Sequence, residues 1–155
     1  MTNNDVLRSL RYLLNVSEPA LVEIFKLGEQ DIGTADIVDF LRGEEDEGYV
    51  ACPDAVMLGF LNGLIIHKRG KSERAPDPNA KPERKITNNV ILKKLRVAFE
   101  LKDEDMHAIF ANADYQISKP ELSALFRKKG HSNYRACGDQ ILRYFLKGLT
   151  LRVRA

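Results

Sequence analysis

Apolar residues recur at helical spacing in eight short blocks, four before residue 70 and four after residue 87. In the first block, Val6, Leu10, Leu13 and Leu14 stand at positions i, i+4, i+7 and i+8, on one face of a helix. No block alternates apolar and polar residues as a half-buried strand does. The pattern therefore predicts an all-α protein. The other apolar stripes run over Leu21–Phe25, Ile37–Leu41, Val56–Leu64, Leu92–Leu95, Met106–Phe110, Leu122–Phe126 and Ile141–Leu149.

Start and stop signals bound these helices. An asparagine before the first stripe suits the N-cap position, and Ser17 and Asp103 are cap candidates for the second helix of each set. The clearest start is Ser118-Lys119-Pro120-Glu121, which joins a capping box to a proline in the first turn. Lys68-Arg69-Gly70 puts basic residues in a last turn and glycine just beyond it, so a helix is predicted to end there.

The two sets of helices are copies of one another. Thr2-Asn3-Asn4 recurs 85 residues later as Thr87-Asn88-Asn89, and this offset aligns residues 2–64 with 87–149 without a gap. The alignment gives 18 identities in 63 positions, so we interpret the chain as a tandem duplication of a four-helix unit. The identical polar, aromatic and small residues include Arg11/Arg96, Arg42/Arg127, Tyr49/Tyr134, Cys52/Cys137, Asp54/Asp139 and Gly63/Gly148.

The duplication predicts three parts: a first helical repeat over residues 1–70, a linker over 71–86 and a second repeat over 87–155. Three prolines among charged residues make the linker unable to continue a helix. A single repeat of about 65 residues has a marginal core. We therefore expect the two repeats to pack together as a pseudo-symmetric pair.

The net charge of +2 conceals an uneven distribution. Residues 1–64 hold 4 basic and 12 acidic side chains, whereas residues 87–155 hold 13 basic and 7 acidic ones. The alignment sets Lys129-Gly130-His131-Ser132 against the acidic run Glu44-Glu45-Asp46-Glu47. Clustered basic residues are the electrostatic footprint of nucleic-acid binding. The candidate phosphate contacts are Lys93, Lys94, Arg127, Lys128, Lys129, Arg135, Arg143 and Lys147, with Arg152, Arg154, Lys81, Arg84 and Lys85 as further candidates.

Three interpretations of this charge stay open. The leading hypothesis is a regulatory, non-enzymatic binding module whose basic repeat contacts nucleic acid or a nucleic-acid-associated partner. The alternative is a protein-interaction or self-associating scaffold, in which acidic and basic surfaces attract an acidic protein or a second copy. The third interpretation is that these charges form only solvated helix faces.

The sequence offers no catalytic or cofactor motif. It contains no P-loop, no dinucleotide fingerprint, no zinc-protease helix and no serine-hydrolase elbow, so we expect neither an enzyme nor a cofactor. Cys52 and Cys137 stand far apart and no histidine recurs beside them, so no metal site is predicted. We interpret them as buried small residues at the start of the fourth helix, with thiol reactivity there as the alternative.

The recurring arginines and aspartates suggest a structural ion pair. We expect Arg11 or Arg42, and likewise Arg96 or Arg127, to pair with the aspartate that opens the fourth helix of its repeat, Asp54 or Asp139. The alternative is a catalytic carboxylate in a pocket between the repeats. A glycine inside a helix costs about 1 kcal/mol relative to alanine, so Gly63 and Gly148 predict a close approach of two helices.

Two features that the sequence lacks, a membrane-spanning run and a secretory signal, indicate the cellular compartment. No apolar run approaches the roughly 18 residues that span a bilayer. The first five residues, Met1 to Asp5, lack the basic flank and apolar region of a secretory signal. We expect a cytoplasmic protein without a membrane partner.

Several runs resemble a known bacterial family. Asn3-Asn4-Asp5-x-Leu7-Arg8, Cys52-Pro53-Asp54, Phe60-Leu61-Asn62-Gly63-Leu64 and Cys137-Gly138-Asp139-Gln140 are similar to the YehS-type family, and the similarity extends over essentially the whole chain. The resemblance implies a cytosolic protein built from two copies of a domain of unknown function. It implies no activity, cofactor or catalytic residue.

Overall fold

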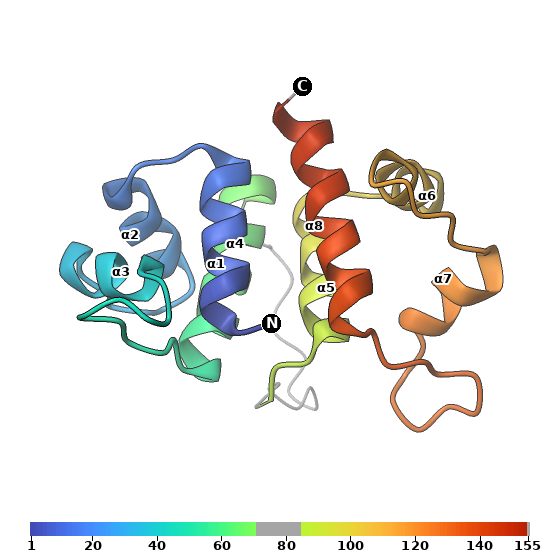
Figure 1. Ribbon diagram of the computed structural model, residues 1–155, viewed down its shortest axis with the longest axis horizontal. Coiled ribbons are helices and arrows are strands. Elements are labelled where there is room, and N and C mark those ends of the chain that lie inside the picture. The colour runs from blue at the N-terminus through green and yellow to red at the C-terminus, as the bar shows by residue number, and fades with distance from the viewer. Residues whose placement is uncertain (71–84, 155) are drawn as a thin grey trace. The chain divides into compact units, whose positions relative to one another are not determined.

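The computed structural model describes residues 1–70 and 85–154, in which all regular structure is helical (Figure 1). The chain divides into two compact units, Met1–Ile86 and Thr87–Ala155. The first unit contains α1 (Asn3–Leu14), α2 (Glu18–Leu27), α3 (Thr34–Leu41) and α4 (Asp54–Arg69). The second contains α5 (Asn88–Ala98), α6 (Asp103–Asn112), α7 (Lys119–Leu125) and α8 (Asp139–Arg154). The predictions of an all-α fold and of a duplicated four-helix unit are confirmed.

The backbone of the second unit repeats that of the first. Each of α5 to α8 begins 85 residues after its counterpart in α1 to α4. Left-handed residues after the helices recur at the same offset, with φ of 53° at Asn15 and 54° at Glu100, and 62° at Glu29 and 57° at Asp114. Because side chains other than glycine rarely adopt this conformation, the paired occurrences show that both copies turn in the same way after their first and second helices.

The helix caps confirm some sequence expectations and correct others. Ser118 and Glu121 form the predicted capping box of α7, and Ser17 caps α2. Threonine, not asparagine, caps the first helix of each unit: Thr2 Oγ1 accepts from the Asp5 N–H at 3.1 Å, and Thr87 Oγ1 accepts from the Val90 N–H at 3.2 Å.

Two further helix ends test the boundaries predicted from the sequence. Asp103 is the first residue inside α6 rather than its N-cap, so that expectation is also wrong. The helix α4 ends at Arg69, before Gly70 at φ 82°, as predicted.

Residues 71–84, most of the predicted linker, lie outside the described residues, and so do Lys81 and Arg84. The expected packing of the two repeats against each other stays a prediction.

Each unit closes around a pair of buried phenylalanines. Phe25 of α2 and Phe60 of α4 lie 4.9 Å apart between ring centroids, and their counterparts Phe110 and Phe145 lie 5.9 Å apart. All four side chains are fully buried. The predicted apolar stripes therefore supply the core of each unit, with Leu14, Leu41, Val56 and Phe126 half-buried at its margin.

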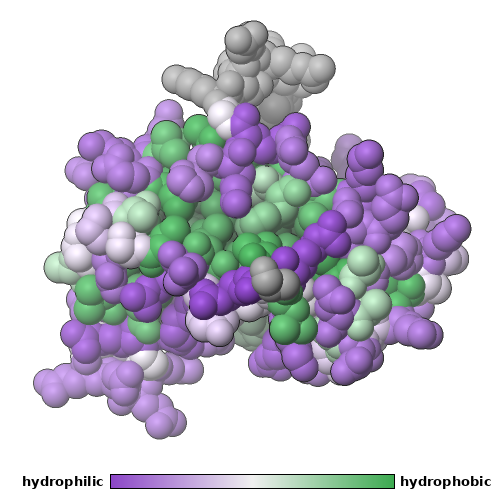
Figure 2. Space-filling model, turned by 90° about the horizontal axis from the view of Figure 1, so that it is seen from above, coloured by the Kyte–Doolittle hydropathy of each residue, from purple (hydrophilic) through white to green (hydrophobic). Residues whose placement is uncertain are grey.

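The surface carries both hydrophilic and hydrophobic side chains. Figure 2 shows hydrophilic residues over much of the visible face and hydrophobic residues among them. Within residues 1–70 and 85–154, no helix combines the length and apolar character that crossing a bilayer requires.

Glycine makes the closest helix crossing in each unit possible, as predicted. A Cβ on Gly63 of α4 would lie 1.9 Å from the backbone oxygen of Ile24 in α2. A Cβ on Gly148 of α8 would lie 1.8 Å from the backbone oxygen of Ile109 in α6. In the first unit Gly28 also lies at this crossing, and a Cβ added to it would lie 1.7 Å from the backbone oxygen of Gly59. The helix axes can approach this closely only because no side chain separates the two backbones.

Substituting these glycines tests the crossing. We expect Gly63→Ala and Gly148→Ala each to lower the free energy of unfolding by about 2–3 kcal/mol, because a backbone oxygen cannot rotate away from the new methyl group. The cost outweighs the gain of about 1 kcal/mol in helix propensity. Urea unfolding followed by circular dichroism measures it. Gly138→Ala is the matched control, since nothing lies within 4 Å of its Cβ position, and equal stabilities of all three variants would contradict the crossing.

Candidate functional site

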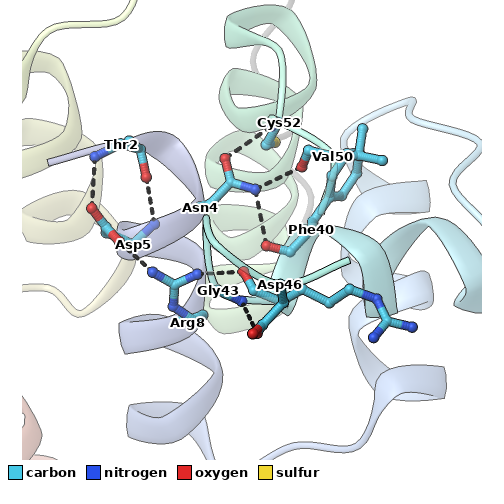
Figure 3. A network of polar contacts seen from close by, with 10 residues as sticks. Thr2, Asn4, Asp5, Arg8, Phe40, Gly43, Asp46, Val50 and Cys52 are labelled. Carbon is cyan, nitrogen blue, oxygen red and sulfur yellow. Dashed lines mark hydrogen bonds and ion pairs between the residues drawn. The ribbon is translucent and has the colours of Figure 1, made fainter. Parts of the chain in front are cut away.

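Two consecutive asparagines at the start of α1 hold the first unit together, and we call them the asparagine latch. The Asn4 amide nitrogen donates to the backbone oxygens of Phe40 and Val50 at 2.9 and 2.8 Å, and its oxygen accepts from the Cys52 N–H at 2.9 Å (Figure 3). Asn3 donates to the Cys52 backbone oxygen and to Asp54. Asn4 is 2% exposed, so these bonds replace the water it has lost.

The latch recurs in the second unit with nearly the same distances. Asn89 donates to the backbone oxygens of Leu125 and Arg135 at 2.9 Å and accepts from the Cys137 N–H at 2.8 Å. Asn88 donates to the Cys137 oxygen at 3.0 Å and to Asp139 Oδ1 at 2.8 Å. Each latch therefore fixes three segments: the end of α3 or α7, the following loop, and the start of α4 or α8.

The predicted Arg–Asp pairs do not form. Asp54 and Asp139 are bound by Asn3 and Asn88, through amide groups that match a carboxylate opening a helix. Arg42 pairs instead with Asp39 of the same helix at 3.1 Å. Asp54 and Asp139 thus accept hydrogen bonds from asparagine amides, and Arg42 has a partner within its own helix.

The other two recurring arginines pair across the first loop of each unit. Arg11 pairs with Glu18 at 3.0 Å and Arg96 with Asp103 at 2.6 Å, which are equivalent positions. Arg96 also donates to the Leu101 oxygen at 2.9 Å, and its guanidinium lies 4.7 Å above the Phe126 ring. These pairs join the first helix to the second, not to the fourth.

Both cysteines are buried, and burial keeps their thiols in the less reactive, protonated form. Cys52 is 5% exposed and Cys137 is 6% exposed, and neither forms a disulfide. Burial raises the pKa of Cys52 to about 12 and that of Cys137 to about 11, so both thiols are protonated at neutral pH. The interpretation as small buried residues is confirmed. Among residues 1–70 and 85–154, no three His, Cys, Asp or Glu side chains are grouped to hold a metal ion.

The two latched loops have equivalent backbone hydrogen bonds and differ in charge, and their backbones differ at two glycines, Gly48 and Gly130, whose positive φ is not repeated at Asn133 and Glu45. We call residues 42–50 the acidic loop and residues 127–135 the basic loop. In the acidic loop, Asp46 N–H donates to the Gly43 oxygen and Tyr49 N–H to the Asp46 oxygen. In the basic loop, the equivalent bonds run from His131 to Lys128 and from Tyr134 to His131. The acidic loop holds one basic and four acidic side chains, and the basic loop holds four basic and no acidic ones.

The basic loop contains half of the predicted phosphate contacts. Arg127, Lys128 and Lys129 are exposed, and no carboxylate of the described chain pairs with them. Arg135 differs, since it pairs with Glu121 at 3.0 Å. Hydrogen bonds from Ser118 and then from Arg135 lower the pKa of the Glu121 carboxyl, so this carboxylate is charged at neutral pH.

The other predicted contacts lie on helices. Lys93 is exposed on α5 at the position equivalent to Arg8, whose guanidinium donates to the Arg42 oxygen at 2.7 Å in the first unit. Lys94 is half-buried. Arg143 and Lys147 are exposed one turn apart on α8, whereas the further candidate Arg152 pairs with Asp105 at 2.6 Å.

Sequence reasoning missed the latch as the organising site. The repeated Thr-Asn-Asn and Cys-x-Asp runs were the available signal, because each latch joins one run to the other. Capping preferences favoured a different use of the asparagines. Nothing in the sequence named their partners, which are mainly backbone groups.

Removing the Asn4 amide group measures how much the latch contributes to the free energy of unfolding. We expect Asn4→Ala to lower the free energy of unfolding by about 3 kcal/mol or more, because three backbone groups lose their partner and each buried one costs about 1–3 kcal/mol. Asn89→Ala should cost less, since Asn89 is only half-buried. Asn112→Ala at an exposed site of α6 is the control. Urea midpoints that do not separate Asn4→Ala from this control would refute the latch.

The comparisons with known proteins agree with the duplicated architecture. The family model described as "Protein of unknown function (DUF1456)" matches residues 3–70 and again residues 88–155. The "Uncharacterized protein YehS" of Escherichia coli (strain K12) is 49% identical over 152 residues, which cover 98% of this chain and 96% of that protein. No solved structure matches the chain. The chain therefore belongs to the DUF1456 family and carries two copies of its domain.

Proposed function

We propose that this protein is a non-enzymatic, regulatory binding module whose second unit contacts the phosphate backbone of nucleic acid. The observation that carries the proposal is the charge contrast between the two latched loops. Their backbone hydrogen bonds are equivalent, so the change from acidic to basic side chains has left the fold intact. A fold does not require that contrast, whereas recognition of a polyanion does.

The arrangement of the cations supports phosphate contacts. Arg127, Lys128 and Lys129 are consecutive and exposed, and Lys93 is exposed at the position equivalent to Arg8, which in the first unit contacts the Arg42 backbone. Cations without carboxylate partners lose no ion pair when they meet a phosphate, and each one neutralised releases counterions. Arg135 is a weaker candidate, because it would have to leave Glu121, although a half-exposed pair is worth only about 0–1 kcal/mol.

The same features support a role without catalysis. The recurring carboxylates accept hydrogen bonds from the latch, and the recurring thiols are buried and protonated. These contacts and this burial support structural roles for the recurring carboxylates and thiols. Two unpaired thiols also suit a reducing compartment, so we infer a cytoplasmic location.

Salt-dependent binding of labelled DNA and RNA tests the proposal. In fluorescence anisotropy, we expect the protein to bind duplex DNA at about 50 mM salt and to lose affinity steeply by about 200 mM. Lys128→Gln and Lys129→Gln should each weaken binding and reduce the salt slope by about 0.9. Lys26→Gln, at an exposed site of the acidic unit, is the matched control. Absence of binding to any nucleic acid at low salt would overturn the proposal.

The acidic loop favours a second candidate function. Its four carboxylates are exposed, so the acidic loop of one copy could attract the basic loop of another in a head-to-tail assembly. Light scattering should then give a mass above 17.6 kDa at low salt that falls to the monomer as salt screens the charges. Glu44→Gln/Glu45→Gln should lower the mass at low salt, whereas a wild-type monomer at low salt would exclude this candidate.

A further inference from the structure

A row of aromatic rings runs from the core of the second unit to its surface. Phe145 and Phe110 are fully buried at the inner end, and Phe110 contacts Tyr115 at 5.7 Å between ring centroids. Tyr115 stacks on Tyr144 of α8 at 4.9 Å with an interplanar angle of 19°. Both tyrosines are half-buried. Tyr144 is the last ring of the row in the described chain, and one face of its ring lies against Tyr115.

The first unit lacks this pair. The positions equivalent to Tyr115 and Tyr144 are Gln30 and Gly59. There, the glutamine side chain fills the space that a Cβ on Gly59 would enter, with its Cγ 2.3 Å from that position. The duplicated fold is therefore complete without an aromatic pair at this place. The tyrosines occur only in the unit that also acquired the basic charge.

Cations border the outer tyrosine. Lys147 follows Tyr144 by three residues, so the two side chains are neighbours on the surface of α8. Arg143 precedes Lys147 by four residues and extends the same exposed surface. Lys147 pairs with no carboxylate in the described part of the chain, whereas Arg143 interacts electrostatically with Asp139, one turn before it on α8. A supported aromatic ring beside exposed cations is the combination that binds a base and its adjoining phosphates.

We propose that Tyr144, backed by Tyr115 and flanked by Lys147 and Arg143, is a stacking platform for an unpaired base of single-stranded nucleic acid. This inference rests on the proposed function and narrows its ligand. In a duplex the faces of the bases are covered by their neighbours, so a rigid ring on a helix cannot reach them. A single strand presents them freely, and stacking tolerates any base.

Binding of a single strand and a duplex by matched variants tests the platform. The probes are a labelled oligothymidylate and a labelled duplex of equal length, at low salt. We expect Tyr144→Leu to weaken binding of the oligothymidylate by roughly 5- to 150-fold, the range of a lost base stack, and to leave duplex affinity unchanged. Tyr144→Phe should retain wild-type affinity, because it keeps the ring. Tyr12→Leu, at an exposed tyrosine of the acidic unit, is the control.

Intrinsic fluorescence of the wild-type protein gives a second readout that needs no variant. The chain has five tyrosines and no tryptophan, so its emission comes from tyrosine. Saturation with oligothymidylate should quench part of this emission, and Tyr144→Phe should lose that part. No quenching at saturation, or equal affinity of Tyr144→Leu and wild type for oligothymidylate, would overturn the platform.

The outcomes separate the platform from the proposed function. If the single strand binds, and binding weakens in Lys128→Gln but not in Tyr144→Leu, the phosphate-binding function stands and the platform fails. If neither probe binds at low salt, the proposed function itself fails.

Discussion

Each unit depends on one side-chain amide that bonds to backbone groups far away in the sequence. Asn4 reaches segments that lie 36, 46 and 48 residues further along the chain, and Asn89 repeats these separations. A buried loop backbone must find partners for its polar groups, and here one side chain supplies three of them. Asn3 and Asn88 also donate hydrogen bonds to the backbone carbonyls of Cys52 and Cys137. Without these bonds the long connection before α4 or α8 would have little to order it.

The latch explains how the two copies could diverge in charge. It binds the loops through their backbone, so it places few demands on the side chains between the anchor points. Glu44 and Lys129 occupy equivalent positions and both are exposed. Exposed charges change stability little, and thus the loop sequence was free to change. Most identities between the copies lie instead at the latch, in the core and at the helix crossing, and within the loops only Arg42/Arg127 and Tyr49/Tyr134 are identical.

The sequence predicted the parts of the fold that depend on periodicity and repetition. Apolar spacing located the helices, the offset of 85 residues revealed the duplication, and Gly63 and Gly148 indicated a close crossing. The sequence did not predict the hydrogen bonds in which a side chain binds a backbone group. Recurrence marked Asn3, Asn4 and Asp54 as constrained, but a main-chain carbonyl leaves no residue type to recognise. The conspicuous opposite charges of arginine and aspartate therefore suggested a pair that does not form.

The duplication also distinguishes residues that the fold needs from residues that it only tolerates. A structural role should appear in both copies, as it does for the latch, for the Phe25/Phe60 and Phe110/Phe145 pairs and for the glycine of the fourth helix. The basic loop and the Tyr115–Tyr144 stack appear in one copy only. Since the first unit folds with acidic residues and a glycine at these places, stability alone does not account for them. Features that a shared fold does not require, and that occur together in one copy, are the ones in which a ligand-binding role is to be sought.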